Sequence, residues 1–438
     1  MGANYSQPPR GYQYSTQQFD NETDILEVAP EYSSFHEMYQ KNYSNERNLP
    51  YLLKMENNEI LSYSYDQCYN FSQNFISFLL QHQIKPNSTI AVFSEASFES
   101  QIVCNASLLF GYHLLLSSPS SIQCDNFCNL IKSYSPFAIF CSANDAATIS
   151  RLSRSQSMII TDSDSKFNSF WKIVKSHSNS VQLIEQDDSF QCITYITNSE
   201  SLNDTNTSIS MTNSEIFKFI SSWSEKLTIC RDATIAAILS CDDNIQRLIN
   251  FLCVHCRAKL CFPDSLNDVK KYKATHIFTS PRIITQEIRQ LDNEIQNDHS
   301  FLFRILYNAE YVWKRMWVLM GSQSPRADKR VFNSLKKDFG EDLHFTFCTG
   351  QIDKKVHEAW LVLYGKPLCT IFSPAEWINV GSSLPCDLRF IKLGTLGGPV
   401  DNSVKIDEDT HKIGSRVTGV LLDKVGFWDE EGALVITN

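Results

Sequence analysis

A polar stretch near the centre of the chain has the layout of a phosphate-binding site. The stretch from residue 191 to residue 219 predicts a short apolar strand followed by a long polar loop, while Thr212 with Glu215 forms a capping-box pattern that predicts a helix start. A strand and loop that lead into a helix N-terminus commonly hold phosphate, because unpaired N–H groups and the helix dipole point there. The position is that of a nucleotide site.

The loop itself lacks the residues that usually bind phosphate. It contains neither glycine nor lysine, and the chain has no glycine from residue 112 to residue 320. Glycine lets the backbone approach phosphate closely at positive φ, whereas the side chains of Asn198, Asn203 and Asn206 would crowd a triphosphate. The central half of the chain therefore contains no glycine-based phosphate cradle.

Two other patterns of reactive residues favour structural roles. Cys253, His255 and Cys256, with Cys261 after them, have the spacing of half a zinc site, but they lie on an apolar stretch and a second ligand pair is absent. Buried core cysteines are the preferred interpretation. No serine has a glycine two residues away on both sides, so the sequence contains no nucleophile elbow.

The composition indicates a globular protein with substantial cores. Hydrophobic residues make up 42% and aromatic residues 12% of the 438 positions, which is enough for two or more subdomains. The net charge of −10, without a basic stripe, argues against nucleic acid as a partner. Scattered cysteines, short apolar runs and the absence of a secretory signal pattern predict a reduced, cytoplasmic protein.

The first 48 residues are polar and aromatic and predict a surface tail. They begin MGANYS, which fits the N-myristoylation pattern with Gly2 as the acceptor and serine at position 6. A single acyl chain gives marginal membrane binding, and neither a nearby cysteine nor a basic cluster adds a second signal. An ordinary soluble N-terminus is the alternative, and lipidation of Gly2 stays an expectation.

From residue 51 the pattern alternates between strands and helices. Ser64 and Gln67 predict the start of a helix whose apolar positions repeat at helical spacing. The alternation predicts largely parallel sheets covered by helices, in two sheet-and-helix subdomains, followed by a small β subdomain after residue 385. Strands are expected at 89–93, 113–116, 136–141, 158–161, 234–239, 259–262 and 275–279, and helices at 99–109, 244–256, 282–296, 301–320 and 327–338.

The order of these segments resembles the adenylate-forming (AMP-binding) enzymes, and most closely the long-chain fatty acyl-CoA synthetases. The matching segments are residues 61–94, 258–282, 394–400 (GTLGGPV) and 426–437 (GFWDEEGALVIT). The resemblance runs from about residue 50 onward and implies the α/β body of those enzymes. It also implies an activity, in which ATP and a fatty acid form an acyl-adenylate and the acyl group then passes to coenzyme A, with Mg²⁺ at the phosphates.

The resemblance places the ATP loop at residues 199–212, where the family has glycine, threonine and lysine. Ser199, Thr205 and Thr207 stand at nucleotide positions there, and Gly350 stands at another. An adenylate-forming transition state needs fixed donors aimed at the developing phosphorane charge, and losing one such donor typically costs about 10²–10³-fold in rate. Because several donors are missing together, the resemblance implies a weakened site.

A second family motif falls at residues 372–376 (FSPAE). The resemblance gives Phe372 the role of stacking on adenine and Glu376 that of binding Mg²⁺. Ala375 replaces the family threonine and has no hydroxyl to offer. The alternative for Glu376 is an exposed carboxylate without a metal.

Two single positions also depart from the family pattern. Asp243 stands where the family has an active-site histidine. The aspartate that accepts the ribose hydroxyls aligns with Lys424, or with Asp423 if the register moves by one, and Gly426 favours Lys424. A lysine can only donate hydrogen bonds, so this contact would change in kind.

The resemblance also sets the expected domain boundaries. Residues 1–48 are expected to be a tail, 49–385 the AMP-binding-like body and 386–438 the small β subdomain. The chain stops where the family's hinge and mobile lid domain begin, so the lid is expected to be absent, and with it water exclusion and the adenylation lysine.

These departures favour a catalytically inactive relative that is retained as a binding or regulatory protein. Its expected partners are a fatty acid or acyl-CoA, an intact synthetase or a membrane surface, and not nucleic acid. Binding of ATP, Mg²⁺ and coenzyme A is doubtful on this interpretation. One alternative is an active ligase that uses Glu376 and a rebuilt loop. Another is a decayed copy without function.

Overall fold

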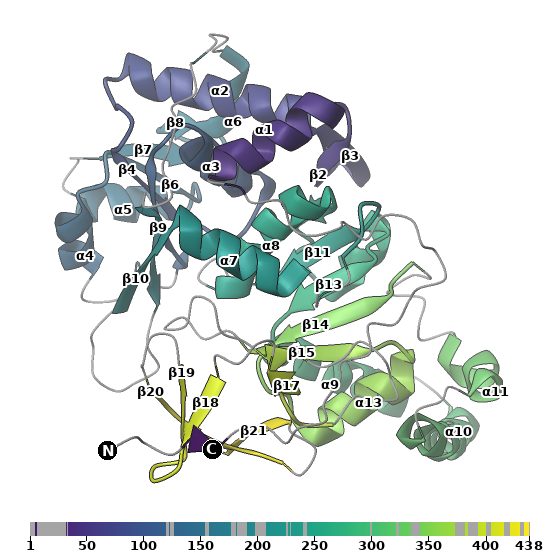
Figure 1. Ribbon diagram of the computed structural model, residues 1–438. Helices are drawn as coiled ribbons and strands as arrows, with labels where there is room; N and C mark the ends of the chain where they lie inside the picture. The colour runs from purple at the N-terminus through teal and green to yellow at the C-terminus, as the bar shows by residue number, and fades with distance from the viewer. Residues whose placement is uncertain are drawn as a thin grey trace. The chain divides into compact units, whose positions relative to one another are not determined.

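The computed structural model resolves two compact units that the chain enters and leaves several times (Figure 1). Unit 1 comprises residues 1–27, 222–238 and 263–438, and unit 2 comprises residues 28–221 and 239–262. The structure describes residues 5–6, 32, 34–119, 122, 127–153, 157–176, 181, 191–197, 207–224, 227, 229–239, 243–297, 300–320, 324–333, 342–372, 382–383, 393–399, 404–415, 421–429 and 433–437.

Unit 2 contains a seven-stranded sheet that is parallel except at one edge. Its order is β10-β9-β5-β4-β6-β7-β8, and only β10 runs antiparallel to its neighbour. The apolar runs predicted as strands are buried in it, as expected for a sheet covered on both faces. The strands are β4 (Thr89–Phe93), β5 (His113–Ser117), β6 (Ala138–Cys141), β7 (Met158–Thr161), β8 (Asn168–Ser169), β9 (Gln191–Thr197) and β10 (Thr207–Thr212).

Helices pack against this sheet and bury apolar side chains from both partners. Phe93 and Ile139 of the strands share a core cluster with Phe127 and Ile149 of two of the helices. The capping box predicted at Ser64 is present, with each side chain bonded to the other residue's backbone N–H. The helices are α2 (Tyr65–Gln81), α3 (Phe98–Leu109), α4 (Phe127–Tyr134), α5 (Ala146–Leu152) and α6 (Phe170–Ser176).

Unit 2 also holds a polar network in its interior. The hydroxyl of Tyr51 donates to Asn250 and accepts from Asn105, and the Asn250 amide donates to Asn105 Oδ1 at 3.1 Å. All three side chains are buried, and the bonds satisfy one another, as buried polar groups require. The network joins β2 (Pro50–Glu56), α3 and α8 (Asn244–Cys256), while β3 (Glu59–Ser64) and β12 (Lys259–Cys261) pair with β2 on its two sides.

Unit 1 contains four parallel strands in the order β15-β14-β13-β11, to which β16 and β17 add an antiparallel edge. Long helices follow β13 and precede β15, in the strand–helix order of a parallel sheet. The elements are β11 (Thr234–Ile238), β13 (His276–Thr279), β14 (Phe345–Thr349), β15 (Leu368–Phe372), β16 (Ser382–Ser383), β17 (Gly398–Pro399), η2 (Leu266–Tyr272), α9 (Pro281–Asn297), α10 (Phe301–Leu319), α11 (Pro325–Ala327), η3 (Asp328–Phe332) and α13 (Lys354–Tyr364).

The expected β structure near the C-terminus is a five-stranded antiparallel sheet in unit 1. Its order is β1-β18-β19-β20-β21, so the N-terminal strand β1 (Tyr5–Ser6) completes a sheet built from the other end of the chain. Phe372, Leu396 and Leu434 form an apolar cluster with side chains of this sheet. The remaining strands are β18 (Val404–Asp407), β19 (Lys412–Ser415), β20 (Leu421–Trp428) and β21 (Leu434–Thr437).

Three segments differ from the prediction. The polar loop after β9 was expected to lead directly into a helix, but residues 207–212 form strand β10, and α7 (Asn213–Ser224) begins after it. Residues 35–46, expected in a surface tail, form helix α1 (Phe35–Glu46) with Phe35 and Tyr39 buried. The helix expected at 327–338 begins as the short α11 and continues as the π-helical η3, whose Phe332 is buried.

Candidate functional site

The carboxyl ends of the parallel strands in unit 1 bring several polar segments together. Strand β13 leads to Pro281 at the start of α9, and β14 leads to Gly350 and the loop before α13. In parallel α/β sheets, ligands bind at this edge, because the loops after the strands converge there. This edge of the sheet is therefore the candidate position of a ligand site.

Gly350 is required at its position by backbone conformation. Its φ is +129°, a region that other residues rarely adopt, and its N–H donates to Cys348 O at 3.0 Å. A Cβ added there would lie 3.5 Å from Pro281 Cγ, which is ordinary contact. Space is therefore available, and the conformation alone selects glycine.

The loop after Gly350 is held at both ends by side-chain hydrogen bonds. Gln351 Oε1 accepts from the N–H of Ile436 at 2.8 Å, which ties the loop to strand β21. Asp353 Oδ1 accepts from the N–H of Lys355 at 2.8 Å and so caps helix α13. These bonds fix one wall of the groove that the loop borders.

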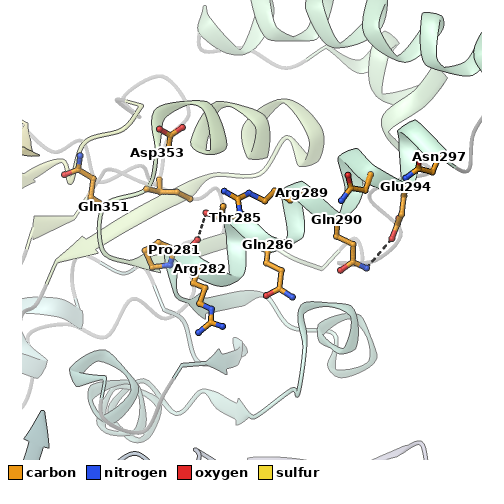
Figure 2. Close-up of a pocket in the computed structure, with 12 residues that line it drawn as sticks. Pro281, Arg282, Thr285, Gln286, Arg289, Gln290, Glu294, Asn297, Gln351 and Asp353 are labelled. Carbon is orange, nitrogen blue, oxygen red and sulfur yellow. Dashed lines mark hydrogen bonds between the residues drawn. The ribbon is translucent and has the colours of Figure 1, made fainter. Parts of the chain in front are cut away.

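That groove has a volume of about 790 Å³ and runs along the exposed side of α9 (Figure 2). Its other wall is the loop with Gln351 and Asp353. The lining is polar and includes Arg282 and Arg289, neither of which has an ion-pair partner among the described residues. The two guanidinium groups lack carboxylate partners and can bind an anion, while Glu294 and Asp353 give the same lining an equal number of negative charges.

The arginines are separated by seven positions on one helix, about 10 Å along its axis. The acidic lining residues are already engaged, since Glu294 accepts from the Gln290 amide at 3.2 Å and Asp353 caps α13. Arginine forks bind carboxylate or phosphate through two parallel hydrogen bonds. The spacing suits a ligand with two separated anionic groups.

The two nucleotide positions Phe372 and Lys424 lie close together. The Lys424 ammonium is 5.8 Å from the centre of the Phe372 ring, a cation–π distance. The ring itself is 5% exposed and packs in the apolar cluster with Leu396 and Leu434. The ring is thus largely covered by its own cluster, and the predicted roles of Phe372 in adenine stacking and of Lys424 at the ribose position stay predictions.

His357 is a fully buried imidazole behind the same loop. Its Nε2–H donates to Leu368 O at 2.9 Å, and its Nδ1 accepts from the N–H of Gly394 at 3.4 Å. Burial lowers the pKa of His357 to about 4. The imidazole is therefore neutral near neutral pH and joins α13, β15 and the turn at Gly394.

Asp243, at the position of the family histidine, begins helix α8 in unit 2. Its Oδ1 accepts from the N–H of Ile245 at 2.8 Å, and its φ and ψ are those of an N-cap residue. The side chain therefore stabilises a helix start, a role that aspartate fills well. Thr207, a predicted nucleotide residue, begins β10 and pairs with Thr197 across the hairpin.

Several predicted site residues lie outside the described residues. They are Gly2, Ser199, Thr205, Ala375 and Glu376, together with the side chain of Asp423. Their predicted roles in lipidation, nucleotide binding and Mg²⁺ binding stay predictions.

The cysteine pattern on α8 lies in the core of unit 2. Cys253, Cys256 and Cys261 are buried, and burial raises the pKa of the Cys253 thiol well above its usual value. Within the described parts of the chain, no group of three or more histidine, cysteine or acidic side chains is placed to hold a metal ion. No described helix is both long and apolar enough to cross a membrane.

Comparisons with known proteins rest on structure alone, because no family model and no curated protein matches the sequence. The N-terminal domain of FACL13 from Mycobacterium tuberculosis matches with a TM-score of 0.69 at 11% identity, covering 93% of this chain and 100% of that one. Unliganded O-succinylbenzoate coenzyme A synthetase (MenE) from Bacillus subtilis matches with a TM-score of 0.67 at 12% identity, covering 92% and 78%. The chain has the fold of these synthetases.

A third match comes from a nucleotide-bound protein with the synthetase fold. ATP-bound MatB from Rhodopseudomonas palustris has a TM-score of 0.68 at 12% identity and covers 91% of this chain and 78% of that one. The predicted α/β class, with two parallel-rich sheets and a small antiparallel sheet, is thereby confirmed. At this identity the likeness establishes the fold and leaves the activity open.

Sequence reasoning missed the residues that give the groove its charge. Arg282 and Arg289 lie at the spacing i, i+7 in a helix that was predicted correctly, so both fall on one face. That spacing is the feature of the sequence that indicates a pair of arginines on one helix face. His357 offered no such signal, because a single histidine in an apolar stretch does not reveal which carbonyl it contacts.

Proposed function

We propose that this chain is a non-adenylating relative of the acyl-CoA synthetases that binds a long-chain acyl-CoA. Binding through the groove along α9 is the core of the proposal. Activity with ATP is expected to be absent, because Asp243 and Lys424 stand where the family resemblance places a histidine and an aspartate.

The main observation in support of a loss of adenylation activity is the position of Asp243. Under the synthetase alignment an imidazole would stand there, but the carboxylate instead caps α8 through Ile245 N–H. A capping carboxylate is fixed by its own helix and carries a negative charge, which opposes the negative charge that develops during adenylation. Lys424 at the ribose position supports the same conclusion, since an ammonium group cannot accept the ribose hydroxyl protons.

The observation that favours acyl-CoA over a free fatty acid is the pair of arginines. A fatty acid has one anionic group, whereas coenzyme A carries a diphosphate and a separate monophosphate. Arg282 and Arg289, about 10 Å apart along the helix, match two separated phosphate groups. The groove volume also falls within the range of pockets that bind small molecules. The long-chain preference rests on the sequence resemblance to long-chain synthetases.

The test combines a binding measurement with an activity measurement on the purified full chain. Isothermal titration with palmitoyl-CoA is expected to show binding, and titration with Mg-ATP is expected to show none. ATP–pyrophosphate exchange in the presence of palmitate is expected to stay at the level without enzyme. The Arg282→Gln/Arg289→Gln variant is expected to weaken acyl-CoA binding by at least about tenfold, because each charge-assisted bond contributes about 1.5–3 kcal/mol.

A matched control separates the groove from general charge effects. Arg151 is an exposed arginine on α5 in unit 2, and Arg151→Gln should leave acyl-CoA binding unchanged. Equal loss in both variants, or no acyl-CoA binding by the parent chain, would contradict the proposal. Palmitate-dependent pyrophosphate exchange that disappears in Glu376→Ala would instead establish the active ligase.

A further inference from the structure

Helix α10 exposes an unusually large apolar face. Ten of the fifteen large hydrophobic side chains that are exposed in the described part of the chain lie between Phe301 and Met320. Phe301 is 68% exposed, Leu302 76% and Met320 67%, and two tryptophans, Trp313 and Trp317, are exposed beside them. Exposed apolar side chains gathered on one helix mark a contact site, so we expect this face to have a partner.

The same helix is attached to unit 1 by its charged side. Lys314 is fully buried and donates to Asp328 Oδ1 at 2.6 Å and to Leu363 O at 3.4 Å. Glu310 is also buried and accepts from Arg330 at 2.9 Å. Buried charged groups need partners, and both of these have one, so the two pairs attach this side of α10 to unit 1.

Helical geometry separates these two faces cleanly. At about 100° per residue, the buried positions Tyr307, Glu310, Lys314 and Val318 fall within one arc of less than a quarter of a turn. The ten exposed apolar positions fall within an arc of about 160° on the other side. The charged anchor therefore turns the apolar face of α10 outward, away from its own core.

The charge of the segment indicates what covers this face. Residues 301–332 carry six cationic and two acidic side chains, a net charge of +4, although the whole chain has a net charge of −10. The two acidic groups, Glu310 and Asp328, already face Arg330 and Lys314. Arg326 and Lys329 follow α10 in sequence and are exposed to solvent.

We propose that α10 is a membrane-docking helix that lies in the interface of an anionic lipid bilayer. Aromatic and aliphatic side chains on one face, together with nearby basic residues in the same segment, are features of helices that lie in the plane of a membrane. A second copy of the chain is the less suitable occupant, because the exposed and basic Arg326 and Lys329 would be brought near their own counterparts, although Arg315 of the same segment is paired with Glu358. Anionic headgroups complement that charge.

The predicted lipidation of Gly2 would add to this docking. A single acyl chain anchors a protein only marginally, and stable attachment needs a second membrane-binding element. Helix α10 supplies such an element, and β1, which follows Gly2 closely in sequence, pairs with β18 in the same unit as α10. The proposal concerns α10 and does not require the acyl group.

The test is flotation of the non-acylated full chain with vesicles. Vesicles of phosphatidylcholine with about 30% phosphatidylserine are expected to bind the protein more tightly than pure phosphatidylcholine vesicles. The Trp313→Ser/Trp317→Ser variant is expected to lower the partition coefficient by at least about tenfold, because two exposed aromatic side chains no longer enter the interface. Both side chains are exposed, so the variant should keep the circular dichroism and melting temperature of the parent.

Matched controls assign the effect to α10. Phe137 is 56% exposed in unit 2, and Phe137→Ser should bind vesicles like the parent chain. Arg326→Glu/Lys329→Glu should lose the preference for phosphatidylserine, while Lys132→Glu/Lys270→Glu should keep it.

Three results would overturn the proposal. The first is a parent chain that does not float with either kind of vesicle. The second is equal binding by the parent and the tryptophan variant. The third is a dimer, seen by sedimentation velocity, that the tryptophan variant converts to a monomer without any vesicle binding, because α10 would then be an interface between copies.

Discussion

At the scale of single residues, several buried polar side chains of this protein connect secondary-structure elements through hydrogen bonds. His357 uses both ring nitrogens to connect α13 to Leu368 of β15 and to the turn at Gly394. Asn105 and Asn250 connect two helices through the Tyr51 hydroxyl in the same manner. Such hydrogen bonds persist only while each side chain keeps the protonation state that its partners require, which for His357 is the neutral imidazole.

His357 therefore predicts a loss of stability in mild acid. Its pKa is about 4 in the folded protein and about 6.5 in an unfolded chain. Between these values the unfolded chain binds the proton first, so the free energy of unfolding falls as the pH decreases from about 6.5 to about 4. The shift corresponds to about 3 kcal/mol in total, or up to about 1.4 kcal/mol per pH unit.

Urea unfolding at several pH values between about 4.5 and 7 measures this slope. His357→Gln cannot titrate, so the slope that belongs to His357 should be missing from the variant, whatever its stability near neutral pH. Parallel curves of stability against pH for the parent and the variant would show that His357 is not the acid-sensitive group.

At the scale of elements, the attachment of α10 depends on the buried pair of Lys314 and Asp328. The ammonium has a second acceptor in Leu363 O and lies 4.5 Å from the centre of the Phe332 ring. Because these contacts replace the water that the charge loses, the pair is stable as a unit. Removing one partner leaves the other charged and buried.

Lys314→Met is expected to lower the free energy of unfolding by about 3–5 kcal/mol. Lys314→Met together with Asp328→Leu should recover much of this loss, because no uncompensated charge remains. Arg315→Gln, which breaks an exposed pair with Glu358, is the control and should cost less than about 1 kcal/mol. Urea unfolding of the four chains in the cycle gives the coupling energy, and additive losses would contradict a coupled pair.

Most elements could be predicted from the sequence because their patterns are local. The strand at residues 158–161 and the helix at residues 244–256 have the predicted bounds, since apolar periodicity and flanking turn residues define them. The interpretation of residues 199–212 as a nucleotide loop does not predict strand β10, although residues 208–211 alternate polar and apolar side chains. Met211 is buried and Ser210 is exposed, as that alternation requires.

Features that depend on distant partners could not be predicted in this way. Helix α1 is polar overall, and its burial depends on contacts such as the Phe35 ring packing edge-on against Phe251 of α8. The outward turn of α10 depends on Asp328 and Leu363, which follow Lys314 of this helix by 14 and 49 residues. Periodicity reveals that a helix has two faces, but a tertiary partner decides which face is buried.

In the candidate site, too, residue types could be predicted from the sequence, but contacts with distant residues could not. The position of Asp243 before a helix was visible in the sequence, but its role as a cap needed the bond to Ile245. Lys424 was assigned to the ribose position, while its contact with the covered ring of Phe372 came from the structure. Single residue types could be read from the sequence, whereas their surroundings could not.

At the scale of the whole molecule, the chain crosses between its two units four times. It starts in unit 1, enters unit 2 at residue 28, returns for residues 222–238, leaves for residues 239–262 and ends in unit 1. One of these boundaries falls between Ser221 and Ser222, inside the residue range of helix α7. Helix formation is cooperative, and unfolding one half of α7 weakens the other half.

We therefore expect the two units to unfold in one cooperative transition. Asp243→Ala removes an N-cap in unit 2 at a cost of about 1 kcal/mol, and His357→Gln alters the hydrogen bond between α13 and Leu368 O in unit 1. Each variant should lower the urea concentration at the unfolding midpoint by the same amount in both units. Hydrogen exchange of the amides in α3 reports on unit 2, and that of the amides in α13 reports on unit 1. Asp243→Asn, which keeps a capping oxygen, is the control and should shift neither. If Asp243→Ala lowered the midpoint at α3 while α13 kept its own, the units would be independent, and the two halves of α7 would not unfold cooperatively.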